Sequence, residues 1–256
     1  MQSLNPTLVV EYLIWQSIIY FPFKLRFMGY CLKIIVLVDN EPGPQLFGEW
    51  GLSMYTEKEN VKILFDADTN PAILDHNAKK LEVDLSKLDF AVLSHYHYDH
   101  SNGFRLVGKL KHGLPIYVPP GPSYQLEEIG LKPIVVKKTT EVCEGVYVVG
   151  PLEAWENFYE IALAIKIKDR GLVLLVGCSH PGVDKIALKA REDLGINVYH
   201  VIGGFHGPSK EILDNLAKIA TYISPSHCTG NTAKNYLNQK YPEKYREVRT
   251  GTVIEY

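Results

Sequence analysis

The chain has 256 residues, of which 46% are hydrophobic and 22% are charged, an ordinary balance for one large globular domain or two small ones. Its net charge of -2 at pH 7 excludes the basic footprint of a nucleic-acid-binding protein, so we expect no nucleic-acid partner. The four cysteines form no C-x-x-C pair, and no secretory signal precedes them, which predicts a reduced, cytoplasmic protein.

The N-terminal segment differs from the rest of the chain. Residues 8–23 are strongly apolar, but Glu11 interrupts the run and Pro22 ends it, so it is too short for a membrane span. No Lys or Arg precedes it, unlike in a signal peptide. We predict an N-terminal extension over residues 1–30, such as a misassigned start would produce, followed by a domain over residues 31–256. A packed helix and an interfacial anchor are the alternatives, and the sequence argues against a membrane partner.

Short apolar runs alternate with segments of helical periodicity from residue 31 onward. The predicted strands lie at residues 32–39, 61–68, 89–95, 114–120, 145–150, 161–171, 172–180, 196–206, 222–230 and 251–256. The predicted helices lie at residues 71–81, 103–111, 182–195, 209–220 and 231–240, and Gly195 ends the third of them. The order predicts one α/β domain with at least eight strands in mixed sheets and with helices outside.

Polar residues suited to a functional site follow the predicted strands at their carboxyl ends. They are Asp66 and Asp68, the residues 95–100, Cys178 to His180, His206, and His227 to Thr229. Ligands of open α/β sheets bind beyond the carboxyl ends of strands. We therefore expect these groups to converge on one edge of the sheets.

The segment 94–103, SHYHYDHSNG, holds three of the nine histidines within six positions. Side chains at i and i+2 of an extended segment point the same way, so His95 and His97 can grip one ion. Asp99 and His100 follow the turn and face a second position. Imidazole and carboxylate groups bind Zn, Mn, Fe, Co or Ni. Further ligands must come from later strand ends, where the histidines are His180, His206 and His227.

The pattern His95-x-His97-x-Asp99-His100 resembles the signature of the metallo-β-lactamase superfamily. The matching segments continue in the order of one subfamily, with FGEWGLS at 47–53, LFDAD at 64–68, GCSHPG at 177–182, GGFH at 203–206 and HCTG at 227–230. That subfamily consists of metal-dependent hydrolases of β-lactamase superfamily II. It includes the archaeal 7,8-dihydropterin-6-ylmethyl-4-(β-D-ribofuranosyl)aminobenzene 5'-phosphate synthase of methanopterin biosynthesis.

The resemblance implies an αββα sandwich of two mixed sheets with outer helices and a dinuclear metal site at one edge. Two divalent ions are implied, with zinc as the first expectation. By motif, six ligands divide between them, the first ion taking His95, His97 and His180 and the second taking Asp99, His100 and His227. Many members have a bridging aspartate where this chain has Cys178. Either this thiol is a ligand, or water or hydroxide alone bridges the ions.

Other positions near the cluster have more than one interpretation each. Asp66 either holds a ligand imidazole in its tautomer or forms an Asx-turn. His206 helps the leaving group depart, contacts substrate or simply packs. Thr229 and Gly230 precede a helix whose free N–H groups suit an anion, but ordinary capping by Thr229 or Asn231 is the favoured interpretation. The remaining histidines and cysteines are predicted to be structural, namely His76, His112, His200, Cys31 and Cys143.

Two classes of function stay open at this stage. In an enzyme, the ions activate a water or polarise a substrate oxygen, and Asp99 orients the water or takes its proton. The expected substrate is an anionic or phosphorylated small molecule. Either an arylamine displaces diphosphate from a dihydropterin methyl carbon, as the resemblance implies, or water hydrolyses a phosphoester or lactone. The non-enzymatic alternative is a metal- or redox-sensing domain that uses Cys178 and Cys228. A homo-oligomer is compatible with either class.

Overall fold

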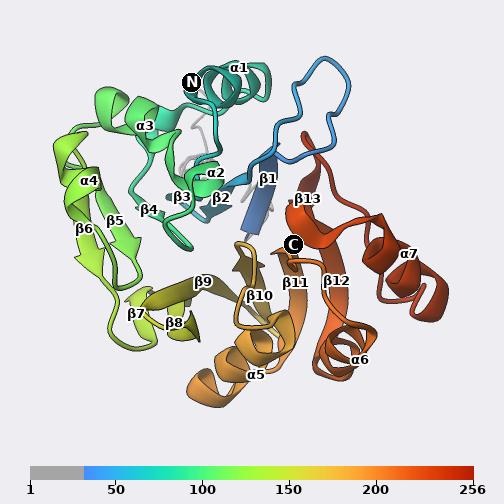
Figure 1. The fold of residues 1–256 in the computed structure, drawn as a ribbon. Coiled ribbons are helices and arrows are strands. Elements are labelled where there is room, and N and C mark those ends of the chain that lie inside the picture. Colours follow the sequence, from blue (N-terminus) through green and yellow to red (C-terminus); the bar gives the residue numbers. More distant parts are fainter. Residues whose placement is uncertain (1–31) are drawn as a thin grey trace, which may run out of the picture.

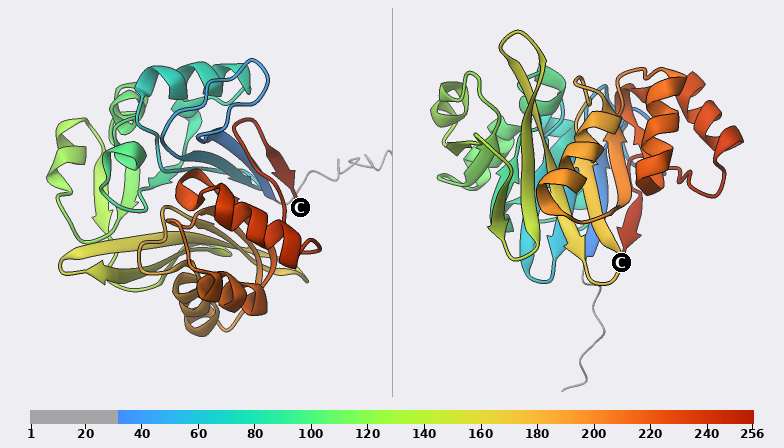
Figure 2. Two further views of the ribbon diagram at one scale, coloured as in Figure 1. Left: turned by 45° about the vertical axis from the view of Figure 1, so that its right-hand side comes forward. Right: turned by 90° about the horizontal axis from the view of Figure 1, so that it is seen from below.

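The structure, a computed structural model, describes residues 32–256. The predicted extension over residues 1–30 and Cys31 lie outside the described residues. Two sheets stack face to face, and helices cover their outer faces (Figures 1 and 2). This arrangement confirms the predicted αββα sandwich.

The first sheet comes from the N-terminal half of the described chain and is closed by the last strand. Its seven strands lie in the order β13-β1-β2-β3-β4-β5-β6. Their bounds are β1 Leu32–Val38, β2 Ser53–Lys58, β3 Val61–Phe65, β4 Phe90–Val92, β5 Pro115–Val118, β6 Lys132–Val135 and β13 Val253–Glu255. Strands β3 to β6 run parallel to one another, whereas β13, β1, β2 and β3 are antiparallel neighbours.

The second sheet has six strands in the order β12-β11-β10-β9-β8-β7. Their bounds are β7 Thr140–Cys143, β8 Val146–Trp155, β9 Phe158–Ile167, β10 Gly171–Val176, β11 Val198–Gly204 and β12 Ala220–Ser226. Strands β10, β11 and β12 are parallel, and β7 to β10 are antiparallel. Both sheets are therefore mixed, as predicted.

The central strands are buried on both faces. Leu32, Ile34 and Val36 of β1 belong to the core between the sheets, whereas Ile35 and Leu37 belong to the core beneath the outer helices. A strand buried on both faces has a continuous apolar sequence, so β1 shows no alternation of polar and apolar residues. Each such aliphatic side chain stabilises the fold by about 1.5–3 kcal/mol on burial.

The helices follow local sequence signals. Their bounds are α1 Pro71–Lys80, α2 Tyr98–Ser101, α3 Phe104–Leu110, α4 Tyr124–Glu128, α5 Val183–Leu194, α6 Lys210–Ile219 and α7 Asn231–Lys240, with 3-10 turns at Leu85–Lys87 and His227–Thr229. The side chains of Asn70 and Ser209 cap α1 and α6 by accepting backbone N–H bonds. Gly195 ends α5 in the left-handed conformation, which confirms the predicted stop. Within residues 32–256, no helix is both long and apolar enough to cross a membrane.

Three strands were not predicted, and their composition explains why. Strand β2 begins buried but ends in Glu57 and Lys58. Strand β6 is an edge strand that contains Pro133 and is largely exposed. Strand β7 is a second edge strand whose first two residues, Thr140 and Glu141, are polar and exposed. Edge strands carry a weak hydrophobic signal because only one neighbour and little core specify them.

Candidate metal centre

The predicted site residues lie where parallel strands of the two sheets end. His95 and its neighbours follow β4, which pairs in parallel with β3, and Asp66 follows β3 directly. His180, His206 and His227 follow β10, β11 and β12, which are parallel neighbours. The structure therefore brings the carboxyl ends of both parallel segments together, as expected.

Backbone strain is concentrated at the same place. Ten residues other than glycine have a positive φ in the described chain, and half of them are site residues: Asp66, Asp68, Ser179, His206 and His227. A left-handed conformation is costly for a non-glycine residue and persists where the surroundings impose it. Its concentration at these strand ends favours a functional explanation.

One group of three imidazoles is formed by His95, His97 and His180. One nitrogen of each ring lies within 4.8 Å of the others. His95 Nε2 is 3.1 Å from His97 Nδ1, and the ring centroids of His97 and His180 are 5.0 Å apart. Three imidazole nitrogens around one point are a suitable set for a divalent ion.

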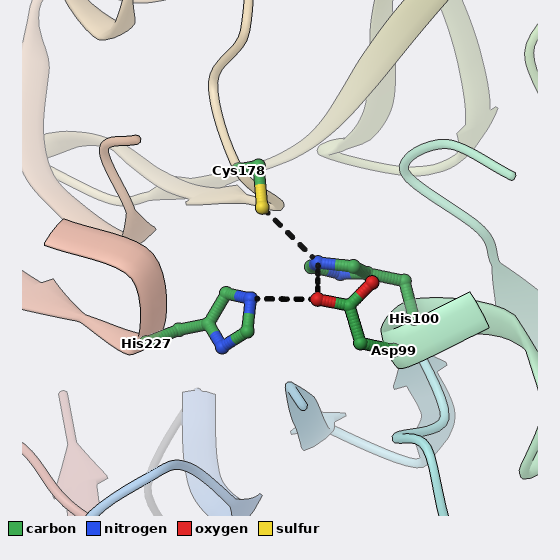
Figure 3. A group of neighbouring side chains, drawn as sticks. All are labelled: Asp99, His100, Cys178 and His227. Carbon is green, nitrogen blue, oxygen red and sulfur yellow. Dashed lines mark hydrogen bonds and ion pairs between the residues drawn. The ribbon is translucent and has the colours of Figure 1, made fainter. Parts of the chain in front are cut away.

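A second group is formed by Asp99, His100, Cys178 and His227, whose ligand atoms also lie within 4.8 Å of one another (Figure 3). Asp99 Oδ2 is 3.7 Å from His100 Nε2 and 3.3 Å from His227 Nε2. Cys178 Sγ approaches His100 Nε2 from the opposite sheet at 3.2 Å. The group thus combines one carboxylate, two imidazoles and one thiol.

The two groups are direct neighbours. The ring centroids of His95 and His100 are 4.2 Å apart. Cys178 also lies near both His180 and His206, because one ligand atom of each falls within the same 4.8 Å limit. Cys178 therefore stands between the groups, at the position where the resemblance places a bridging residue.

A buried carboxylate fixes the orientation of two of these histidines, one directly and one through Ser94. Asp66 is fully buried, and its Oδ2 accepts hydrogen bonds from His100 Nδ1 at 2.7 Å and from Ser94 Oγ at 2.7 Å. The Ser94 hydroxyl has only one proton, so its 2.9 Å contact with His95 Nδ1 is a bond that the ring donates. Both rings therefore direct Nε2 toward the centre, and the predicted role of Asp66 agrees with this geometry.

Two further anchors were not recognised in the sequence. Glu160, fully buried in β9, accepts bonds from His180 Nδ1 at 3.0 Å and from His180 N at 2.9 Å. Asn40, just after β1, accepts a bond from His227 Nδ1 at 2.9 Å. The sequence signal for Glu160 is an acidic residue directly before an apolar run. Because a carboxylate is rarely buried without a partner, this position predicts a polar partner for Glu160.

Burial and mutual repulsion keep most of the imidazoles neutral. Burial lowers the pKa of His95 well below its ordinary value, and the neighbouring histidines lower it further. Burial likewise lowers the pKa of His97 and of His227. Burial opposes protonation of His100 too, but the Asp66 carboxylate raises its pKa to about 9. Burial would raise the pKa of Asp99, yet the contact with His227 and the charge of His100 lower it. Neutral imidazoles and an ionised carboxylate are the forms that bind metal.

The residues present fit a metal centre. His227 Nε2 is buried and has no hydrogen-bond partner, and its 3.3 Å contact with Asp99 lacks hydrogen-bond alignment. A buried nitrogen left unpaired beside a carboxylate is costly unless a cation binds there. The donor set of imidazole, carboxylate and thiol suits zinc and related divalent ions.

The remaining predicted residues vary in position. His206 is exposed, and its ring centroid is 4.4 Å from that of His180, so it borders the first group. The Thr229 hydroxyl donates to Ser226 O and accepts from Phe205 N, and Gly230 occupies the N-cap of α7 without a side-chain bond. The favoured capping of α7 by Thr229 or Asn231 was therefore wrong, because Thr229 is engaged with the preceding turn.

The histidines and cysteine predicted to be structural lie apart from both groups. His200 is buried in β11 and bonds with Ser224 Oγ at 2.8 Å. His76 packs against Phe47 with a ring-centroid distance of 4.6 Å. His112 is exposed after α3, and Cys143 ends β7.

Comparison with known proteins agrees with this geometry. Residues 62–158 match a family model described as the beta-lactamase superfamily domain. Over 88% of its length, the chain is 26% identical to a Methanocaldococcus jannaschii protein named 7,8-dihydropterin-6-methyl-4-(beta-D-ribofuranosyl)-aminobenzene-5'-phosphate synthase, of which it covers 97%. The chain thus resembles members of the metallo-β-lactamase superfamily in part of its sequence and in its fold.

Solved structures show the same fold. Tm1679, a metal-dependent hydrolase of the beta-lactamase superfamily, superposes with a TM-score of 0.76 at 23% identity, over 88% of this chain and 99% of that chain. The metallo-beta-lactamase fold protein YhfI from Bacillus subtilis superposes with a TM-score of 0.65 at 16% identity, over the same shares of the two chains. The chain therefore shares the fold of both neighbours.

Proposed function

We propose that this chain is a metal-dependent enzyme that joins 7,8-dihydropterin-6-ylmethyl diphosphate to ribofuranosyl-aminobenzene 5'-phosphate and releases diphosphate. The adjacency of two ligand groups at one sheet edge supports it, in a chain similar along nearly its whole length to a relative named as such a synthase. The substrates are anionic, phosphorylated small molecules. This chemistry matches a centre built to hold cations.

The two groups would hold two divalent ions, with zinc as the first choice. His95, His97 and His180 form one ligand set, and Asp99, His100 and His227 form the other. When bound, the ions supply positive charge that stabilises the oxygens of a departing diphosphate, or that lowers the pKa of a water molecule in a hydrolysis. The outer anchors Asp66 and Glu160 keep the imidazoles in the tautomer that presents Nε2.

Asp99 is the proposed base. In the synthase reaction the arylamine nitrogen forms a bond to the methyl carbon while the carbon–oxygen bond breaks. The electron pair of the broken bond leaves with diphosphate. The amine must then lose a proton. Asp99 has a lowered pKa, so it is ionised, and it belongs to the second group, where it would orient the amine and accept its proton once the new bond makes the nitrogen acidic. His206, exposed beside His180, is placed to hydrogen-bond the leaving diphosphate.

Hydrolysis of a phosphoester or lactone is the second candidate function, because the same side chains would serve it with water as the nucleophile. The name of one solved neighbour, a metal-dependent hydrolase, favours this candidate. The thiols of Cys178 and Cys228, 3.2 Å apart, favour the third candidate, a redox-sensing domain. The proposed compartment is the cytoplasm, where a thiol pair of this kind stays reduced.

Diphosphate release tests the proposal directly. Zinc-loaded protein is mixed with the pterin diphosphate, with and without the arylamine phosphate, and diphosphate is measured. Release that requires the arylamine supports the synthase, release without it supports a hydrolase, and no release in either mixture contradicts both pterin reactions. Asp99→Asn should lower the rate at least about 100-fold without unfolding the chain. Asp75→Asn, a matched change on the outer helix α1, should leave the rate unchanged.

A further inference from the structure

Both tryptophans of residues 32–256 are unusually exposed and border the metal centre. Trp50 is 60% exposed and Trp155 is 50% exposed. Burying a tryptophan is a large hydrophobic gain, so leaving half of it in solvent gives up stability. The ring centroid of Trp50 lies 5.2 Å from that of His227, and the centroid of Trp155 lies 5.3 Å from that of His180. One tryptophan therefore touches each ligand group.

Trp155 is held as a rigid platform. It ends β8 and pairs across the tip of the β8–β9 hairpin with Phe158. The two rings stack with their centroids 4.3 Å apart and their planes 7° apart. Phe158 lies in turn 4.8 Å from the His97 ring at 33°. One face of the indole is thus covered by Phe158, which leaves the opposite face to provide the exposed area. The β8–β9 hairpin projects beyond the rest of its sheet (Figure 2).

Trp50 lies on a loop that is hydrogen-bonded to Thr69 and to the segment 95–100. The Trp50 carbonyl accepts a hydrogen bond from Thr69 Oγ1. Leu52 N donates to the Asp99 carbonyl at 3.2 Å. Between them, a side chain at Gly51 would meet Asp68 Oδ1 at 2.0 Å, so only glycine permits this approach. The Trp50 ring is therefore positioned by the same backbone that carries Asp99.

We propose that Trp155 and Trp50 form the binding site for the flat heteroaromatic ring of the substrate, with Trp155 as the stacking surface for the pterin. The inference rests on the proposed function, which supplies the pterin. Flat π-systems stack on exposed indoles, and the loss of one such contact weakens binding by about fivefold or more in nucleobase complexes. The ring would stack beside the imidazoles, and its anionic diphosphate would extend toward the two groups of side chains that would hold the cations. Trp50, next to His227, forms the wall on the side of the second group.

Separate binding of the ring and of the anion tests the assignment. The dissociation constants of 6-hydroxymethylpterin and of inorganic diphosphate are measured by calorimetry on the zinc-loaded chain. Trp155→Ala and Trp50→Ala should each weaken pterin binding about fivefold or more, whereas Trp155→Phe should stay within about threefold of wild type. Diphosphate binding should not change. Tyr124→Ala, which removes an equally exposed aromatic ring on α4, is the control and should bind both ligands normally.

The outcomes separate this inference from the proposed function. Unchanged pterin binding in Trp155→Ala, with arylamine-dependent diphosphate release by wild type, overturns the inference alone. Equal weakening of pterin and diphosphate binding also overturns it, because the indole would then support the whole site rather than the ring. A wild-type chain that neither binds the pterin nor releases diphosphate overturns both. Selective loss of pterin binding supports both.

Discussion

Glu160 Oε2 lies 3.0 Å from Nδ1 of His180 and 2.9 Å from its backbone nitrogen. The same carboxylate accepts a bond from Ser179 N through Oε1 at 2.7 Å. One fully buried side chain of β9 thus fixes both the ring and the backbone of a proposed ligand that follows β10. Gly177 leaves room for this carboxylate and for Ser94, since a Cβ at Gly177 would lie 3.0 Å from Glu160 Oε1 and 2.1 Å from Ser94 Oγ.

Replacing Glu160 by Gln should therefore weaken metal binding at the first group. The amide keeps the shape but loses the charge that holds the His180 N–H, and loss of such an outer partner costs about 10- to 100-fold in affinity. Competition with a chromogenic chelator measures the change, and circular dichroism checks the fold. Glu153→Gln, on the exposed part of the adjacent strand β8, should bind metal like wild type. Equal affinities for Glu160→Gln and wild type would show that the contact does not support a ligand.

The contrast between His95 and Glu160 shows what sequence could and could not predict. Histidines are scarce, so three within six positions stand out from the sequence alone. Glu160 is one of many acidic residues, and its partner lies 20 residues away, in the turn that follows another strand. Only the pairing of β9 with β10 brings them together. Local patterns identify ligand types, whereas the residues that orient the ligands depend on tertiary packing.

Some elements of the fold could likewise be predicted from the sequence, and others could not. Continuous apolar runs predicted β1, β10 and β11, because strands buried on both faces need them. Capping residues and Gly195 predicted the ends of helices. The edge strands β6 and β7 were missed because they bury little surface. The exposed aromatic rings at the site were also missed, since exposure is a property of the folded chain.

Metal content should distinguish the two ligand groups. Wild-type protein is expected to retain two equivalents of zinc after gel filtration, measured by plasma mass spectrometry. His97→Ala and His227→Ala each remove one imidazole from a different group, so each should retain one equivalent. His112→Ala, which removes an exposed histidine outside both groups, should retain two. A wild type that saturates at one equivalent would contradict the dinuclear proposal.

Oxidation of the Cys178 and Cys228 thiols should lower zinc binding by the second group. Cys178 Sγ lies 3.2 Å from both Cys228 Sγ and His100 Nε2. Diamide would remove two electrons and two protons from the thiols. The two sulfur atoms would then form a disulfide with an S–S distance of about 2.05 Å. The treated, metal-free chain should lose two of its four thiols and should then bind one equivalent less zinc, and dithiothreitol should reverse both effects.

The cysteine variants make that prediction specific. Cys228→Ser cannot form the disulfide and should keep its zinc binding after diamide. Cys143→Ser retains the pair and should respond like wild type, because Cys143 lies at the end of β7. If Cys228→Ser loses zinc binding as readily as wild type, oxidation acts elsewhere. In that case the redox-sensing alternative has no support from this pair.

Stability should depend on pH through His200, which lies away from the metal centre. Burial, together with the positive charge of Arg246, lowers its pKa to about 3. The ring is 4% exposed and bonds with Ser224 Oγ and Tyr256. Because the folded pKa lies below the unfolded value of 6.5, the unfolded chain binds the extra proton first as pH falls. The stabilisation is complete above about pH 6.5 and is lost progressively toward pH 3.

At pH 5 this one group should lower the free energy of unfolding by about 2 kcal/mol relative to pH 8. Urea unfolding at the two pH values measures the difference. His200→Gln removes the titration, so it should be less stable at pH 8 but should show a pH dependence smaller by about that amount. His112→Gln, at an exposed position, should keep the wild-type pH dependence. An identical pH dependence in His200→Gln and wild type would mean that His200 is not held neutral in the folded chain.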